Sequence, residues 1–304
     1  MLKTIIILLT TFIVLPVVAL RFDAPLDNEQ WEMIKTGIYI MLAVAGICFI
    51  TGELTHNTSQ VDKIWSIVPV VYAWVFALHT CQPRMILMAV LVTVWGIRLT
   101  YNFGRKGAYS WKLWAGEEDY RWAVVRENPL LKGRVRWMLF DLFFVCLYQN
   151  TLLLMITLPM VIVVNTGNGA ITVWDVLIAG LFMAFVIIET IADQQQWLFQ
   201  QEKQRRLKAG AKPEGDYAKG FISSGLFAYV RHPNYAAEQA IWICFYLFSI
   251  AATGRWLNWG AAGCLLLIVL FQSSSDFSEA ISIKKYPAYQ EFKKRVPRFV
   301  PKLW

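Results

Sequence analysis

Residues 171–191 read ITVWDVLIAGLFMAFVIIETI, an apolar run in which Asp175 and Glu189 are the only charged side chains. A helix needs about 20 predominantly apolar residues to cross a bilayer, and this run is long enough. Comparable runs lie at about 4–20, 33–51, 64–80, 85–101, 137–164, 239–252 and 256–273. The sequence therefore predicts an all-α fold, a polytopic membrane helix bundle with about seven to eight transmembrane helices.

The composition agrees with this fold class and excludes an ordinary soluble domain. Hydrophobic residues make up 57% of the 304 residues and charged residues only 16%, against about 25% charged in soluble proteins. The first run follows Lys3 and ends at Val17-Val18-Ala19, which also fits a cleavable signal peptide. We favour a first transmembrane helix, because the charge pattern supports an even number of spans.

Lys and Arg gather in the segments 102–136 and 193–236 and in the tail from residue 284. Short basic loops stay on the cytosolic side, so all three segments are predicted to be cytosolic. The net charge of +8 is then an orientation signal with some attraction to anionic membrane lipid. No contiguous basic face with interleaved aromatic residues is visible, so we expect no nucleic-acid partner. The predicted location is a bacterial inner membrane or a eukaryotic endomembrane.

Cysteine and histidine spacing gives no reason to expect a metal site. The five cysteines fall in or beside apolar runs without a C-x-x-C pair, which is typical of small buried side chains. His56, His79 and His232 lie far apart in the sequence. We therefore predict no metal.

Two acidic positions near apolar runs are candidates for function. Glu189 lies inside a predicted span, where a carboxylate is costly unless it is paired, hydrated or bound to a ligand. Asp193 and Gln196 share its helical face through i, i+4 and i+7 spacing. Asp62 opens the third predicted span, where it fits either a helix cap or the mouth of a cavity.

The densest polar stretch is GLFAYVRHPNYAAE, residues 225–238. Arg231 and His232 are candidate partners for an anion, and Pro233 is predicted to start a helix. Asn234 and Glu238 would then share one face of that helix. A polar segment from Gln200 to Gly220, which includes Arg206, is predicted to be a loop that closes over a bound molecule.

The pattern Gly225-Leu226-Phe227-x-Tyr229-Val230-x5-Tyr235-x2-Glu238, followed by Lys285-Tyr286-Pro287, resembles the C-terminal domain of steroid 5α-reductases. Over nearly its whole length the chain is also similar to an uncharacterised family of bacterial and fungal membrane proteins that carries this domain. The resemblance implies that residues 137–304 bind NADPH on the cytosolic side and that helices in residues 1–136 hold a lipid-like substrate. The implied cofactor-binding residues are Glu189, Asp193, Arg206, Tyr229, Arg231, His232, Asn234, Tyr235, Glu238, Glu279 and Tyr286.

The chain departs from the reductase pattern in its N-terminal half. Trp95 occupies the position of a catalytic Tyr, and the accompanying acid can only be Asp62 or Glu53, of which we take Asp62 as the candidate catalytic residue. The Arg-His-Pro-x-Tyr run is also similar to isoprenylcysteine and phospholipid methyltransferases, which use S-adenosylmethionine. Those enzymes have a pair of acidic residues near the tail where this chain has only Glu279. The expected activity is therefore NADPH-dependent reduction of an activated C=C bond, with S-adenosylmethionine-dependent methyl transfer as the alternative.

Overall fold

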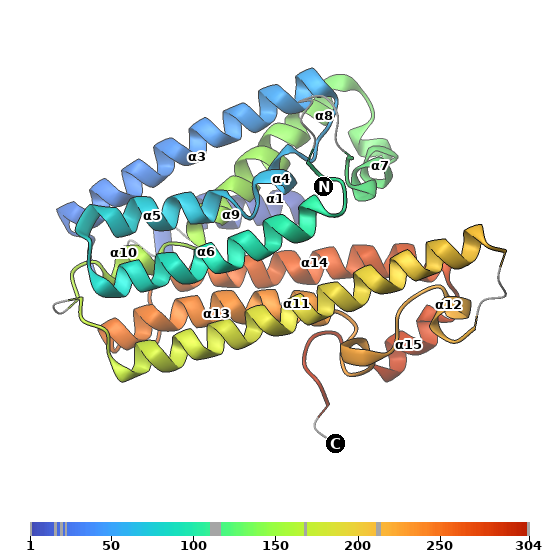
Figure 1. The fold of residues 1–304 in the computed structure, drawn as a ribbon. Coiled ribbons are helices and arrows are strands. Elements are labelled where there is room, and N and C mark those ends of the chain that lie inside the picture. The colour runs from blue at the N-terminus through green and yellow to red at the C-terminus, as the bar shows by residue number, and fades with distance from the viewer. Residues whose placement is uncertain are drawn as a thin grey trace. The chain divides into compact units, whose positions relative to one another are not determined.

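A computed structural model of the chain describes residues 2–14, 17–18, 21, 23–109, 117–166, 169–210 and 214–302, and within these ranges the regular structure is entirely helical (Figure 1). Six helical segments are long and apolar enough to cross a membrane. They are α3 (Asn28–Thr55), α6 (Pro83–Gly104), the run Arg134–Val163, α11 (Val173–Lys208), α13 (Pro233–Thr253) and α14 (Ala261–Lys285). The predicted polytopic helix bundle is confirmed, and the chain is an integral membrane protein.

The shorter elements connect or extend these spans. Residues 15–16 and 19–20 of the first predicted span, and with them the expected cleavage position at Ala19, lie outside the described residues. The remaining elements are α1 (Leu2–Leu9), η1 (Thr10–Val14), α4 (Gln60–Ile64), the apolar α5 (Val68–Thr80), α7 (Tyr120–Arg126), η2 (Pro129–Leu131), α12 (Asp216–Lys219), η4 (Gly225–Ala228) and α15 (Tyr289–Arg295).

The run 134–163 changes helix type along its length. It consists of α8 (Arg134–Phe140), the π-helix η3 (Asp141–Tyr148), α9 (Gln149–Met155) and α10 (Pro159–Val163). Pro159 stands at the first position of α10, where its missing N–H costs no hydrogen bond. Short π-helical segments, of which η1 is another, are rare and frequently occur at functional sites, so η3 is a position of interest.

Helix α11 corrects the prediction of a loop from Gln200 to Gly220. The helix continues to Lys208, and a second short helix, α12, follows within the predicted loop. Glu202 forms ion pairs with Arg205 and Arg206, one turn further along α11. Such i, i+3 and i, i+4 pairs stabilise an exposed helix, and the side chains around them are strong helix formers.

The chain forms two compact units. The first comprises Met1–Ile178 and Phe245–Leu266, and the second comprises Ala179–Cys244 and Leu267–Trp304. These units do not correspond to the predicted division into residues 1–136 and 137–304, because the first unit includes residues on both sides of position 136. The predicted division remains a prediction. In the first unit α5 packs on α6 at Gly96, where a Cβ atom would lie 2.5 Å from Val70 Cγ2 of α5.

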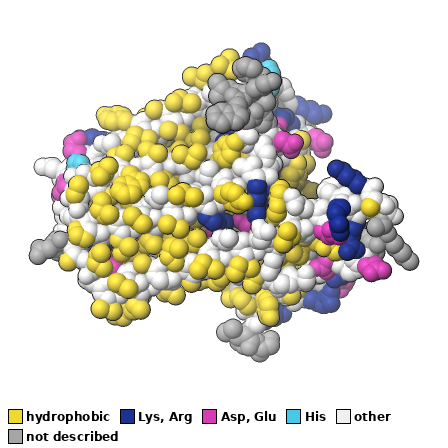
Figure 2. All heavy atoms as spheres, viewed as in Figure 1, with side chains coloured by type: hydrophobic (Ala, Val, Ile, Leu, Met, Phe, Trp, Pro, Cys, Tyr) yellow, Lys and Arg dark blue, Asp and Glu magenta, His cyan; other side chains and the backbone are white. Residues whose placement is uncertain are grey.

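Apolar side chains remain exposed along the long helices, as expected of surfaces that face lipid. Figure 2 shows hydrophobic side chains over most of one face, with acidic and basic side chains gathered where Figure 1 places α12 and α15. On α11 the exposed apolar residues include Trp174, Val176, Leu177, Leu181 and Ile187.

Candidate functional site

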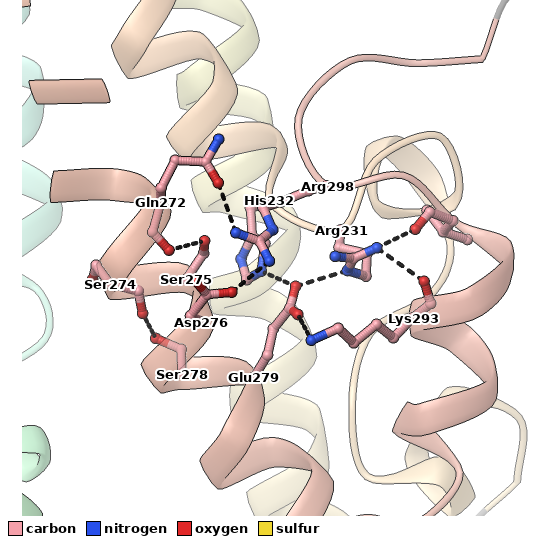
Figure 3. A network of polar contacts seen from close by, with 11 residues as sticks. Arg231, His232, Gln272, Ser274, Ser275, Asp276, Ser278, Glu279, Lys293 and Arg298 are labelled. Carbon is pink, nitrogen blue, oxygen red and sulfur yellow. Dashed lines mark hydrogen bonds and ion pairs between the residues drawn. The ribbon is translucent and has the colours of Figure 1, made fainter. Parts of the chain in front are cut away.

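The second unit is organised around Glu279 of α14, which is completely buried (Figure 3). Its Oε1 atom accepts hydrogen bonds from Arg231 Nε at 2.7 Å and from His232 Nε2 at 2.9 Å. Its Oε2 atom forms an ion pair with Lys293 Nζ at 2.8 Å. We call these four residues, Arg231, His232, Glu279 and Lys293, the tail clamp.

The tail clamp fixes the chain after α15 against the 225–238 motif. Arg231 donates from its guanidinium to the carbonyl oxygens of Lys293, at 3.0 Å, and of Val296. The backbone N–H of Arg231 donates to Pro297 O at 2.9 Å, and that of His232 donates to Arg298 O at 3.2 Å. Residues that are far apart in the sequence therefore form one continuous hydrogen-bonded unit.

This geometry changes the interpretation of the Arg-His-Pro motif. Arg231 is only 7% exposed, and both Arg231 and His232 direct their side chains to Glu279. A charge buried in such a network is costly to leave unpaired, so these two side chains hold the tail in place. A structural role is sufficient to explain the contacts of Arg231 and His232. The anion that these side chains bind is the carboxylate of Glu279, which the sequence pattern does not indicate.

Two of the implied cofactor-binding residues, Asp193 and Asn234, lie in contact. Helix α13 begins at Pro233, and Asn234 Nδ2 lies 3.3 Å from Asp193 Oδ1 on α11. One turn further along α13, buried Glu238 accepts a hydrogen bond from Trp242 Nε1 at 3.0 Å. Glu189 is likewise buried on α11.

Tyr235 lies between aromatic rings, whereas Tyr229 faces outward. The Tyr235 ring stacks on His232 with 5.4 Å between centroids, and it lies 4.8 Å from the ring of Phe271. Tyr229 is 67% exposed. The structure therefore joins Asp193 to Asn234 and Tyr235 to the tail clamp, and it leaves Tyr229 outside both groups.

An open groove of about 1530 Å³ runs along the last four turns of α11. Its opposite wall comes from residues 214–217 and 222–225, and Arg205, Arg206 and Lys208 contribute cations to the lining. Arg206 lies over the ring of Tyr217 at 4.4 Å, and that ring stacks on Phe199 with 5.2 Å between centroids. Sequence reasoning identified Arg206 but missed Tyr217, because the aromatic stack depends on the fold of the 214–217 segment.

Tyr286 belongs to a different contact in the same unit. Lys203 Nζ donates to Gly220 O at 2.6 Å and to the Tyr286 hydroxyl at 2.8 Å. Burial raises the pKa of Tyr286, but the hydrogen bond and charge of Lys203 outweigh this effect and lower it overall. Gly220 has a φ of 85°, and a Cβ atom there would lie 2.3 Å from the Tyr286 ring. This contact therefore requires glycine.

Asp62 lies in the first unit, at the third position of α4. Ser59 is the N-cap residue, which leaves Asp62 inside the first turn. Asp62 Oδ2 accepts a hydrogen bond from Trp122 Nε1 at 3.1 Å. Burial raises the pKa of Asp62, and the charge of Arg121 and the Trp122 hydrogen bond only partly oppose this.

The first unit also contains a hydrogen-bond network that joins residues 118–119 to residues 58–59. The sequence pattern does not reveal this network. Glu118 Oε1 accepts a hydrogen bond from Thr58 N at 2.7 Å, and Asp119 N donates to Ser59 Oγ at 3.0 Å. These contacts hold the 117–126 segment against the loop before α4. Across the described ranges no group of three His, Cys, Asp or Glu is arranged to hold a metal ion.

Comparisons with known proteins place the chain in a family. A family model described as "Protein of unknown function (DUF1295)" matches residues 48–296. The chain is also 35% identical, over 279 residues, to an uncharacterized protein of Schizosaccharomyces pombe, with 88% of this chain and 79% of the relative covered. No solved structure matches. The chain therefore belongs to the DUF1295 family.

Proposed function

We propose that the protein is an integral membrane reductase that uses NADPH to reduce an activated C=C bond in a steroid-like or other lipid substrate. The observation that carries the proposal is the groove on α11, with its cationic and aromatic lining. A volume of about 1530 Å³ is ample for a dinucleotide. The resemblance to steroid 5α-reductases supplies the reaction class.

The lining fits the adenosine end of NADPH. The Arg206 and Tyr217 pair offers flat faces on which an adenine ring stacks. Arg205 and Arg206 both pair with Glu202, whereas Lys208 makes no ion pair within the described part of the chain. Lys208 is therefore the cation best placed to attract a 2′-phosphate. S-adenosylmethionine has no phosphate, so this lining favours NADPH over the methyl donor.

Asp193, Asn234, Tyr235 and Glu238 would orient the cofactor, and the tail clamp would support them. The Asn234 amide, held by Asp193, presents a fixed donor and acceptor. Bound NADPH would provide a hydride for one carbon of the C=C bond, and a proton would add to the other carbon. Within this proposal Asp62 polarises the substrate carbonyl, because a carboxyl group with a raised pKa donates a hydrogen bond over a wider pH range.

Thermal unfolding of the purified protein in lipid nanodiscs tests the proposal. NADPH at about 100 times its dissociation constant is expected to stabilise the folded state by about 2.7 kcal/mol. NADH is expected to bind more weakly, and Lys208→Ala should reduce this preference for NADPH. Lys294→Ala, which removes an exposed cation outside the groove, is the matched control. Stabilisation by S-adenosylmethionine but not by NADPH would replace the reductase proposal with the methyltransferase alternative.

A further inference from the structure

Asp141 in the first unit is a buried acid that the proposed reductase does not use. It is the first residue of the π-helix η3 and is only 3% exposed. Its Oδ2 atom lies 4.0 Å from Cys146 Sγ, five residues further on, because the i to i+5 geometry of a π-helix brings such residues together. Its Oδ1 atom has no hydrogen-bond partner among the described residues.

Asn150 supplies a second unsatisfied acceptor on the same helical run. Its side chain is fully buried and donates from Nδ2 to Cys146 O at 2.8 Å, while Oδ1 has no hydrogen-bond partner in the described chain. Asp141 faces Gly52 of α3, where an added Cβ atom would lie 3.7 Å from the Asp141 Oδ2 atom. A buried acceptor without a partner is costly, so both atoms indicate a ligand that donates hydrogen bonds.

The charges around Asp141 indicate that this ligand is a cation. Glu53 directly follows Gly52, the residue that faces Asp141. Arg126 and Glu118 also act on the charge of Asp141. Arg126 is already bound to Glu118 through two hydrogen bonds of 2.5 and 2.6 Å. Glu53 and Asp141 have no ion pair within the described ranges. Helix α3 ends at Thr55, and the carbonyl groups of its last turn add further attraction for positive charge.

The surroundings favour an organic cation. The buried cluster that contains Cys48 and Cys146 is packed against Phe49, Trp65, Trp122 and Phe140. Aromatic faces attract ammonium groups and also accommodate hydrocarbon. We propose that Asp141 and Glu53 bind the primary ammonium group of an amphiphilic amine, whose hydrocarbon part lies against these aromatic side chains. This site is independent of the proposed cofactor site.

Calorimetric titration of the full chain in phosphatidylcholine nanodiscs tests the proposal, with partitioning into empty nanodiscs subtracted. Dodecylamine is expected to bind saturably. Dodecanol, which lacks the charge, and dodecyltrimethylammonium, which lacks N–H donors, are not expected to bind saturably. Asp141→Asn and Glu53→Gln should each weaken dodecylamine binding about tenfold or more, because each removes a charge-assisted contact. Glu127→Gln, an exposed acid of the same unit, is the matched control and should bind as the unaltered protein does.

Three results would overturn the proposal. The first is that dodecylamine does not bind saturably, and the second is that dodecanol binds as tightly as dodecylamine. The third is that the Asp141→Asn and Glu53→Gln proteins both bind dodecylamine as tightly as the unaltered protein. Glu53→Gln keeps the test decisive if Asp141→Asn fails to fold, since Glu53 is only partly buried. A second titration, with nanodiscs that contain phosphatidylethanolamine, identifies the source of the amine. Competition with dodecylamine indicates a membrane aminolipid, and its absence indicates a free amine.

Discussion

Replacing Glu279 by Gln should release the tail from the 225–238 motif. The substitution keeps the shape of the side chain and one acceptor oxygen, but it removes the negative charge that Arg231, His232 and Lys293 share. Breaking a buried ion pair by removing one partner costs about 3–5 kcal/mol. We take about 3 kcal/mol, because the amide oxygen of Gln still accepts one hydrogen bond. Local opening of the tail should then rise about 100-fold.

Limited trypsin digestion of the nanodisc-embedded protein measures this opening. Cleavage after Lys294 and Arg295 should accelerate by about the same factor, because cleavage follows the population of the open form when reclosing is fast. Glu291→Gln, on the same short helix, removes an exposed ion pair with Lys294 and should leave the rate almost unchanged. Cleavage of the Glu279→Gln protein within about threefold of the original rate would refute the reasoning.

Three further predictions concern stability. Gly220→Ala should cost about 1–2 kcal/mol from its positive φ alone and more from its clash with Tyr286, so adding Tyr286→Ala should restore part of the loss in thermal unfolding. Arg84 and Asp175 form a buried ion pair, so Arg84→Met, which leaves Asp175 without this partner, should cost about 3–5 kcal/mol in thermal unfolding. The double variant Arg84→Met, Asp175→Leu should lose less stability than Arg84→Met alone. Hydrogen bonds outweigh burial and lower the pKa of Asp216 to about 2. The ionised carboxylate therefore contributes about 2 kcal/mol of local stability above pH ~4, and this contribution should be lost as the pH falls through about 2. Hydrogen exchange in segment 214–223 measures this loss, and Asp216→Asn should abolish the pH dependence.

The sequence predicts the helices better than the contacts between them. Apolar length locates most of the spans, although the predicted run 64–80 contains only the shorter α5. Pro233 marks the start of α13, because proline limits the backbone in a known way. The contact between Asp193 on α11 and Asn234 on α13 does not follow from helical spacing, because that spacing relates only residues of the same helix. The partner of Arg231 does not follow, because Glu279 is 48 residues away and only the tertiary fold brings it close.

The π-helix is a second feature that periodicity cannot reveal. Residues five apart fall on different faces of an α-helix, so the pairing of Asp141 with Cys146 has no sequence signature. The extension of α11 beyond its apolar run was missed for the opposite reason. The polarity of residues 200–208 suggests a loop, although the same residues are good helix formers with paired charges.

The length of α11 determines from which solvent its groove is reached. Its 36 residues span about 54 Å at about 1.5 Å per residue, whereas the hydrocarbon layer of a bilayer is about 30 Å thick. A helix standing upright therefore projects about 24 Å, or about 16 residues, beyond the lipid. Counted back from Lys208, the projecting part begins close to Asp193, where the apolar sequence ends. A highly charged ligand thus reaches the groove directly from water, without contact with the hydrocarbon that surrounds the rest of the helix.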